Sequence, residues 1–245
     1  MRYIDIHSHI LHGVDDGSKS LDMSLELLAM MGNQGITDVI ATPHFDARYE
    51  NFEEYKETAT SAFEELKSAS SGKGLPNIYL GSEVYYFKGI GKSNGIRNLT
   101  LADSKYLLLE LSGADIDDTV IKEIQGIYDN VGLIPILAHV ERYATVKGFK
   151  KLLKLFDSGL AMAQINAPSV FGQPFKRAAL KLIKKGYASF IATDAHSTDR
   201  RPPMLSQALD TVEEQFGTHQ KSVFLKNSEK LLDEILKTQK ENIFI

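Results

Sequence analysis

Short apolar runs alternate with longer amphipathic segments along the whole chain. Each short run has three to five residues rich in Ile, Leu or Val, and this pattern predicts a strand buried on both faces. The predicted strands are Tyr3–Ile6, Val39–Thr42, Ile78–Leu80, Tyr106–Leu109, Ile134–Ala138, Met162–Ile165 and Phe190–Ala192. The predicted helices are Met23–Gln34, Phe52–Ser68, Asp118–Asn130, Phe149–Asp157, Phe175–Lys185, Met204–Phe216 and Ser228–Gln239.

The ends of the helical segments agree with this alternation. Gly35, Gly132, Gly159 and Gly186 each follow a periodic segment, where a left-handed helix C-cap is expected. Strand and helix repeated about seven times predict an α/β fold with parallel strands and right-handed crossovers. A closed or nearly closed β/α barrel is the simplest architecture, and an open doubly wound sheet is the alternative. With 245 residues and no convincing linker, we expect a single domain over residues 1–245.

Polar side chains recur at the carboxyl end of these predicted strands. Five of the seven histidines of the chain lie at such positions. The strand-end residues are His7 and His9, His44, Glu83, Glu110, His139, Asn166, and Asp194 with His196. In a β/α barrel the carboxyl ends of all strands meet on one face, so these side chains are expected to meet in one pocket.

The residue types and their spacing indicate a metal site. In His7-x-His9 the two imidazoles lie two residues apart, and on a continuing strand they would point to the same side. Asp194-x-His196 repeats this spacing with a carboxylate, and the loop with Asp16 follows the first strand closely. Imidazole nitrogens and carboxylate oxygens are the usual protein ligands of divalent metals.

Composition excludes several classes of protein. There is no cysteine, which excludes disulfide scaffolds, cysteine-ligated zinc, iron–sulfur clusters and cysteine nucleophiles. The formal net charge is -4, from 28 Lys and Arg against 32 Asp and Glu, which disfavours nucleic acid as a partner. No apolar run approaches the roughly 18 residues of a membrane span, and the first residues do not resemble a signal peptide. We therefore expect a cytoplasmic protein without membrane insertion.

Taken together, these residues resemble the PHP (polymerase and histidinol phosphatase) superfamily. The matching elements are His7-Ser8-His9, Asp15-Asp16-Gly17, Thr42-Pro43-His44, Glu83, His139 and Asp194-Ala195-His196. The chain is most similar to the bacterial manganese-dependent protein-tyrosine phosphatases of the capsule and exopolysaccharide type. Glu110 and His139-Val140-Glu141-Arg142-Tyr143 point to that branch. The resemblance implies a distorted (β/α)7 barrel of the PHP type and three metal ions.

The resemblance also implies which residues bind these ions. The implied sets are His7, His9, Glu83 and Asp194 for one ion, Glu83, Glu110 and His139 for a second, and Asp16, His44 and His196 for a third. His12 is expected not to be a ligand. Arg142 and Arg201 match the phosphate-binding arginines of the family, with Arg200 as the alternative to Arg201.

This set of residues suits phosphate ester hydrolysis. Four carboxylates and three divalent ions leave a site of about +2, which favours a phosphate dianion, and two arginines add forked donors. The expected mechanism is attack on phosphorus by a hydroxide that bridges two ions. Ligation by imidazole and carboxylate admits manganese, iron or zinc, and the resemblance favours manganese.

Two functions follow from this chemistry. The first is removal of phosphate from a phosphotyrosine protein, which the resemblance suggests is a bacterial tyrosine kinase of capsule or exopolysaccharide synthesis. The alternative is a small-molecule phosphatase such as histidinol phosphatase. A barrel without activity that serves as a scaffold is a third interpretation, which a metal-free protein would favour. The sequence leaves the oligomeric state open.

One further feature is a basic helix face at Lys147, Lys150, Lys151 and Lys154. A solvated surface is the simplest interpretation, and docking of an acidic phosphotyrosine segment is the alternative.

Overall fold

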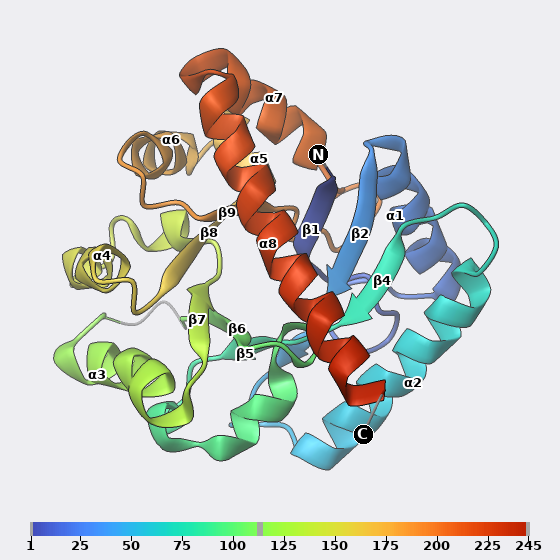
Figure 1. The fold of residues 1–245 in the computed structure, drawn as a ribbon, viewed down its shortest axis with the longest axis horizontal. Helices are drawn as coiled ribbons and strands as arrows, with labels where there is room; N and C mark the ends of the chain where they lie inside the picture. Colours follow the sequence, from blue (N-terminus) through green and yellow to red (C-terminus); the bar gives the residue numbers. More distant parts are fainter. Residues whose placement is uncertain (1, 112–114, 244–245) are drawn as a thin grey trace.

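The computed structural model describes residues 2–111 and 115–243, and its parallel strands curl into a barrel surrounded by helices (Figure 1). Nine strands lie within these residues. They are β1 (Tyr3–Ser8), β2 (Ile36–Ala41), β3 (His44–Phe45), β4 (Asn77–Leu80), β5 (Glu83–Tyr85), β6 (Tyr106–Glu110), β7 (Ile134–Leu137), β8 (Met162–Asn166) and β9 (Phe190–Ala192).

The strands form two sheets, of order β1-β2-β4 and β3-β5-β6-β7-β8-β9, and every paired strand is parallel to its neighbour. The chain passes from β2 into β3 and from β4 into β5 after short interruptions. At the other side, β1 meets β9, because the amide of His9 donates to the carbonyl of Ala195 at 2.8 Å. Seven strand positions therefore follow one another around a curled sheet, as the barrel interpretation predicted, and the doubly wound alternative is wrong.

The short strands β3 and β5 were not predicted. Each continues a predicted strand after a break, at Pro43 after β2 and at Gly81 after β4. Pro43 has no amide hydrogen to donate to a sheet. A Cβ atom at Gly81 would lie 3.0 Å from Leu101 Cδ2, so this backbone packs too closely for a side chain. These breaks separate the strand ends that carry His44 and Glu83 from β2 and β4 and place them in the second sheet.

Eight α-helices and several short helical turns connect the strands within the described residues. The α-helices are α1 (Leu21–Asn33), α2 (Phe52–Ser70), α3 (Asp118–Gly126), α4 (Phe149–Asp157), α5 (Ala167–Phe171), α6 (Lys176–Lys184), α7 (Leu205–Phe216) and α8 (Thr218–Ile243). The 3-10 turns are η1 (Ile90–Lys92), η2 (Asn94–Leu99), η3 (Leu101–Asp103) and η5 (Val140–Tyr143), and η4 (Ile127–Val131) is a π turn. No helix in the described ranges is long and apolar enough to cross a bilayer.

Two helices differ from the prediction. The short helix α5 was missed, and α8 begins at Thr218 rather than at Ser228. The first turn of α8 is polar and forms ion pairs with α7, and Phe224 and Leu225 are its first buried apolar residues. Lys221 Nζ lies 2.8 Å from carboxylate oxygens of Asp210 and Glu213 on α7. Apolar periodicity, on which the prediction depended, is therefore weak in this segment.

The interior of the barrel is apolar at one end and polar at the other. Inward-facing side chains such as Ile6, Leu108 and Phe190 are fully or almost fully buried. At the amino ends of the strands they pack against Leu231 and Ile235 of α8, which crosses the barrel in the foreground of Figure 1. The carboxyl ends of the strands are not covered by α8, and the polar side chains gather there.

Candidate metal centre

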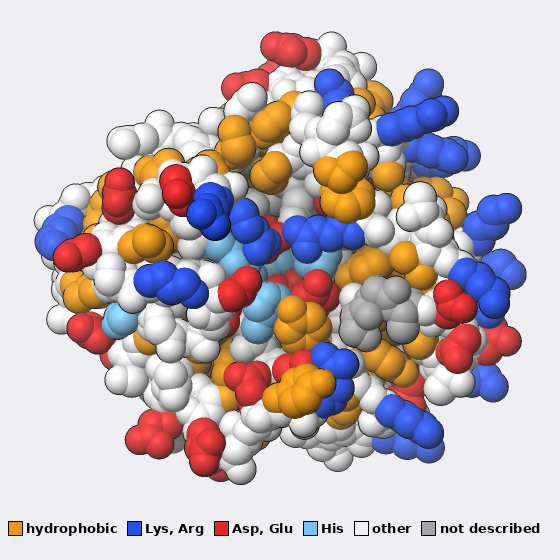
Figure 2. Space-filling model, turned by 180° about the vertical axis from the view of Figure 1, so that it is seen from behind, with side chains coloured by type: hydrophobic (Ala, Val, Ile, Leu, Met, Phe, Trp, Pro, Cys, Tyr) orange, Lys and Arg blue, Asp and Glu red, His pale blue; other side chains and the backbone are white. Residues whose placement is uncertain are grey.

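Nine imidazole and carboxylate residues predicted as ligands lie together at the carboxyl ends of the strands. They come from β1 and the loop after it, from β3, β5 and β6, and from the segments after β7 and β9. Figure 2 shows this face, with histidines and acidic side chains at its centre and Lys and Arg beside them. Residues separated by up to 189 positions in the sequence (His7 to His196) therefore share one site.

His7, His9, Glu83 and Asp194, here called the inner group, are almost completely buried. Glu83 Oε2 is 3.1 Å from His7 Nε2 and 3.2 Å from His9 Nε2. Asp194 Oδ1 is 3.4 Å from both of these nitrogens. The three side chains of His7, His9 and Glu83 have no solvent exposure.

The partners of the two imidazoles define their tautomers. His7 Nδ1 lies 3.2 Å from Gln164 Oε1, which also accepts from the amide of His139 and is therefore an acceptor. His9 Nδ1 lies 2.6 Å from Asp15 Oδ2. When both Nδ1 atoms carry the proton, both Nε2 atoms of the neutral rings present lone pairs. These Nε2 atoms are 3.1 Å apart, where two lone pairs repel each other and a shared cation would stabilise them.

Glu110, His139 and Glu83, here called the side group, adjoin the inner group. His139 Nε2 is 3.1 Å from Glu83 Oε1 and 3.4 Å from Glu110 Oε1. Glu83 thus contacts histidines of both groups, as expected of a bridging carboxylate. Its position follows from the register of the short strands, in which Glu83 pairs with His44 on β3 and with Leu108 on β6.

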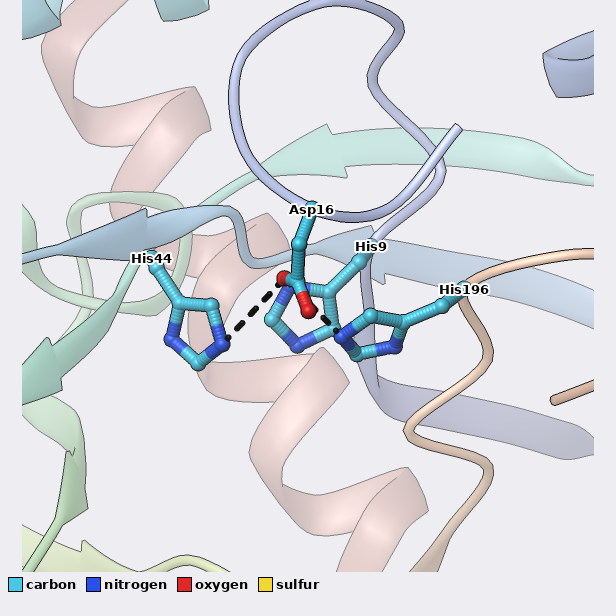
Figure 3. Close-up of side chains that lie close together, drawn as sticks. All are labelled: His9, Asp16, His44 and His196. Atoms are coloured by element: carbon cyan, nitrogen blue, oxygen red, sulfur yellow. Dashed lines mark ion pairs between the residues drawn. The ribbon is translucent and has the colours of Figure 1, made fainter. Parts of the chain in front are cut away.

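Asp16, His44 and His196 are here called the outer group, and Figure 3 shows Asp16 between the two imidazoles with His9 beside them. Asp16 Oδ1 is 3.4 Å from His196 Nε2 and 3.7 Å from His44 Nε2. The side chain of Asp16 is 67% exposed, whereas that of His196 is 4% exposed. His44 also stacks on Tyr85, with 4.7 Å between the ring centroids.

The geometry differs in two respects from the ligand sets that the resemblance implies. The donor atoms of the outer group lie within 4.8 Å of one another together with His9, which was expected only in the inner group. His44, in place of His139, forms such a set with Glu83 and Glu110. The cause is the pairing of β3 with β5, which brings His44 Nδ1 to 3.2 Å from Glu83 Oε2. His12, expected not to be a ligand, is outside all three sets and lies beside Glu65.

Two of the residues have an unusual backbone. His139 has φ of 33° and Asp194 has φ of 52°, in the left-handed region that residues other than glycine rarely adopt. Each residue lies two positions after the end of a strand, so the chain turns sharply while the side chain remains in the site. Such strain costs about 1–3 kcal/mol and persists only where the surrounding structure enforces it.

The charges of the site are incompletely balanced by its own side chains. Burial would raise the pKa of Glu83, but positive charge on His7, when that ring is protonated, and a hydrogen bond from His139 outweigh it and hold this pKa well below its usual range. Burial and the nearby Glu83 carboxylate raise the pKa of Glu110 to about 7. Among the described residues, five buried polar atoms of the site lack a hydrogen-bond partner: Glu83 Oε2, Glu110 Oε2, His44 Nδ1, His139 Nδ1 and His196 Nε2.

These observations fit divalent cations. Buried polar atoms in proteins are almost always hydrogen bonded. A cluster of carboxylate oxygens and imidazole nitrogens without hydrogen-bond partners therefore needs another partner, such as a cation. The convergent lone pairs of His7 and His9, and the repulsion between Glu83 and Glu110, are both relieved by positive charge between them. The nine residues therefore have the donor types, the proximity and the unmet charge that metal ions require.

Two arginines lie beside the inner group. Arg142 Nη2 and Arg201 Nη2 donate to Asp194 Oδ2 at 2.9 and 2.6 Å, and Asn166 Nδ2 donates to the same oxygen at 2.5 Å. The other oxygen of Asp194 faces His7 and His9. Asp194 therefore connects the arginines to the inner group. Their side chains are 34% and 39% exposed, which leaves donors free for a ligand.

The arginines line a cavity of about 280 Å³. Its wall continues from Arg142, Arg200 and Arg201 to apolar side chains that include Phe171 and Phe175. Arg200 thus shares the cavity with the other two, but only Arg201 of the adjacent pair contacts Asp194. The cavity combines cationic donors with an apolar wall.

Sequence reasoning missed Gln164 and placed Asn166 at a strand end without giving it a role, although both contact the predicted ligands. Gln164 and Asn166 on β8 are buried, and Gln164 Nε2 donates to Asn166 Oδ1 at 2.8 Å. Through them β8 connects His7 and His139 to Asp194. Asp15 was noted only as part of the loop, yet it orients His9 and accepts from the amide of His44 at 2.9 Å. A glutamine inside the apolar run Met162–Ile165 was the available signal.

A family comparison agrees with this geometry. The model for capsular polysaccharide synthesis proteins CpsB/CapC matches residues 3–233. The chain is 36% identical to CapC of Staphylococcus aureus, over 94% of this chain and 91% of CapC. It is 32% identical to the tyrosine-protein phosphatase CpsB of Streptococcus pneumoniae (94% and 98%) and 30% identical to the tyrosine-protein phosphatase YwqE of Bacillus subtilis (94% and 91%).

Solved structures give the same result. The fold matches a chain from the crystal structures of YwqE and CpsB, described as metal-dependent tyrosine phosphatases, with a TM-score of 0.80, 27% identity and 94% coverage of both chains. Histidinol phosphate phosphatase of Lactococcus lactis shares the fold alone, with a TM-score of 0.56, 15% identity and coverage of 87% and 93%. The chain belongs to the CpsB/CapC family of capsular polysaccharide synthesis proteins.

Proposed function

We propose that this protein is a metal-dependent phosphatase that hydrolyses phosphotyrosine in proteins. The observation that carries the proposal is the adjacency of two partly exposed arginines to a buried cluster of metal-ligand side chains, connected through Asp194. The family members CpsB and YwqE, which are named tyrosine-protein phosphatases, support it.

In this proposal the inner, side and outer groups each hold one divalent ion, three in all, with manganese the expected metal and iron or zinc the alternatives. The nine ligands are His7, His9, Asp16, His44, Glu83, Glu110, His139, Asp194 and His196. When bound, such ions lower the pKa of water, which then acts as a nucleophile near neutral pH, and neutralise phosphoryl oxygens.

The protein's own groups bind and orient the phosphate ester. Arg142 and Arg201 present forked donors to its oxygens and stabilise the charge that spreads over them during transfer. Asp194 Oδ2 holds both guanidinium groups in place before the substrate arrives. The leaving phenolate of a tyrosine ester has a pKa of about 10, so it needs little assistance from an acid.

The aromatic ring of the substrate fits the apolar wall of the arginine cavity, which Phe171 and Phe175 line. This placement favours an aryl phosphate over the smaller and more polar histidinol phosphate. The protein substrate in this proposal is a cytoplasmic tyrosine kinase of capsule or exopolysaccharide synthesis, and one domain over residues 1–245 carries the activity.

A side-by-side assay tests this proposal. Turnover of a phosphotyrosine peptide is compared with turnover of histidinol phosphate, with metal content measured in the same sample. We expect the peptide to be hydrolysed with the higher kcat/KM. Preference for histidinol phosphate would establish the alternative, and a protein that binds no metal and hydrolyses neither would support the scaffold interpretation.

A further inference from the structure

A groove of about 770 Å³ lies between α4 and α6, outside the metal centre. Its floor is apolar and is made of half-buried or buried side chains. The floor residues are Val146, Phe149, Leu153, Leu182 and Tyr187. We call this cavity the α4–α6 groove.

The rim of the groove is strongly cationic. Its exposed lysines, here called the groove lysines, are Lys150, Lys154, Lys181 and Lys185. Lys151 also lines the groove but is paired with Asp118 at 2.7 Å. In the described part of the chain, no carboxylate lies within ion-pair distance of a groove lysine, and Asp157 is the one acidic residue that lines the groove.

This local charge contrasts with the whole chain, whose net charge is -4. Lys and Arg side chains gather along the right-hand edge of the face in Figure 2, which is the side formed by α3, α4 and α6 in Figure 1. An acidic protein with an unpaired cationic groove attracts anionic ligands to that place specifically.

The groove lies next to the arginine cavity. Arg142 lines the cavity, and Ala144, two residues later, lines the groove, so the chain between them spans at most about 7 Å. On α6 and the turn before it, Phe175 lines the cavity and Ala178 lines the groove. A peptide that places one residue at the arginines can therefore continue into the groove.

We propose that the α4–α6 groove binds an acidic segment of the phosphotyrosine protein, with apolar side chains on the floor and carboxylates beside the groove lysines. This inference rests on the proposed function. The groove increases affinity for protein substrates and leaves the chemistry at the metal centre unchanged.

The shape of the groove favours a peptide over a membrane surface. A protein that binds an anionic bilayer places apolar side chains outward, where they enter the lipid. Here the apolar side chains form a recessed floor and the lysines form the rim, which matches an extended chain with alternating apolar and acidic residues.

The test uses the triple variant Lys150→Glu, Lys154→Glu, Lys181→Glu in the full-length, metal-loaded protein. The matched control is Lys73→Glu, Lys226→Glu, Lys230→Glu, which changes net charge equally at exposed positions outside the groove. The substrates are free phosphotyrosine and a phosphotyrosine peptide with ten acidic and apolar residues on each side. A peptide with lysine in place of each acidic residue is the third substrate.

We expect the groove variant to raise KM for the acidic peptide about tenfold at low salt, with kcat unchanged and with free phosphotyrosine unaffected. The control should behave as wild type. A neutral variant with glutamine at the same three positions should give an intermediate KM, and it replaces the charge-reversed protein if that protein does not fold. An unchanged KM, or an equal rise in the control, would overturn the proposal.

Binding of the unphosphorylated acidic peptide, measured by fluorescence anisotropy, separates this inference from the proposed function. If wild type binds this peptide in a salt-sensitive manner and the groove variant does not, the proposed role of the groove is supported, even if phosphotyrosine is not hydrolysed. Hydrolysis of phosphotyrosine without such binding would overturn the proposed role of the groove but not the proposed function. Binding to phosphatidylserine vesicles that the groove variant loses, with peptide binding unchanged, would assign the groove to a membrane surface instead.

Discussion

The inner and outer groups of the metal centre are built in different ways. His7, His9 and Glu83 have no solvent exposure, and Gln164 and Asp15 orient the two imidazoles from behind. At the mouth, by contrast, the side chain of Asp16 is 67% exposed. The fold therefore determines the inner geometry, whereas in the outer group it buries His196 but leaves the carboxylate of Asp16 in solvent.

This difference predicts how severely each position responds to substitution. Buried ligands with several partners leave unpaired polar atoms behind when they change. Exposed ligands are replaced by water at little cost.

Glu83 is the position with the largest expected effect. Replacement by glutamine in Glu83→Gln keeps the shape but removes the charge that faces His7, His9 and His139. Because Glu83 faces histidines of two groups and in our proposal serves more than one ion, we expect a loss of several kcal/mol in transition-state stabilisation, or roughly 10³-fold in kcat. Metal content by mass spectrometry should fall in parallel. Activity within tenfold of wild type would show that Glu83 does not bridge.

Substitution of Arg142 should weaken catalysis on the substrate without loss of bound metal. Arg142→Ala is expected to lower kcat/KM for phosphotyrosine by about 10²–10³-fold, because a donor aimed at the transferred phosphoryl group is lost. Arg142→Lys should recover only part of this loss, since lysine cannot donate in a forked manner. Steady-state kinetics and metal counting are the measurements. Unchanged kcat/KM, or a fall in kcat/KM accompanied by loss of bound metal, would show that Arg142 does not act on the substrate as proposed.

Arg201 and Arg200, which are adjacent in the sequence, are expected to differ in their effect on catalysis. Arg201 contacts Asp194 and Arg200 only lines the cavity. We expect Arg201→Ala to lower kcat/KM by about 10²-fold and Arg200→Ala by less than tenfold. The reverse order, measured on the same phosphotyrosine peptide, would identify Arg200 as the phosphate-binding residue.

Substitution of Gln164 tests whether β8 orients the imidazole of His7 in the inner group. In Gln164→Ala the Nδ1 proton of His7 loses its acceptor, and we expect metal affinity to fall by about 10–100-fold in chelator competition. Gln164→Glu retains an acceptor for His7 and for the amide of His139 and should lose less. If both variants bind metal as tightly as wild type, β8 does not position His7.

Asp16 should show the smallest effect. Asp16→Asn keeps an oxygen near His44 and His196, and water can occupy the exposed position. We expect affinity for one ion to fall by about tenfold, with the other two retained. Isothermal titration calorimetry with Mn²⁺ measures the affinity and the number of ions bound. Loss of all ions in this variant would contradict the separation of inner and outer groups.

The sequence predicted the strand ends well, because His7 and His139 directly follow apolar runs whose burial is evident, and Asp194 follows such a run after one residue. It could not show the grouping of the ligands. His44 and Glu83 meet because β3 pairs with β5, and both strands are too short to be recognised from apolar periodicity.

The residues that orient the site side chains could not be predicted from the local sequence pattern either. Gln164 contacts His7 across 157 positions, and only the closure of the barrel brings them together. Asp15 and Asp16 are adjacent in sequence but act differently, since the loop buries the first against His9 and exposes the second. Such division of roles between neighbouring residues depends on tertiary packing.

Metal removal and restoration tests the central claim most directly. The protein is stripped with a chelator and reloaded with Mn²⁺, and phosphotyrosine hydrolysis and bound metal are measured on the same samples. We predict that activity disappears on stripping and returns in proportion to Mn²⁺ bound, up to three ions per chain. Full hydrolysis by the stripped protein, with no divalent metal detected, would contradict the claim that these nine side chains form a catalytic metal centre.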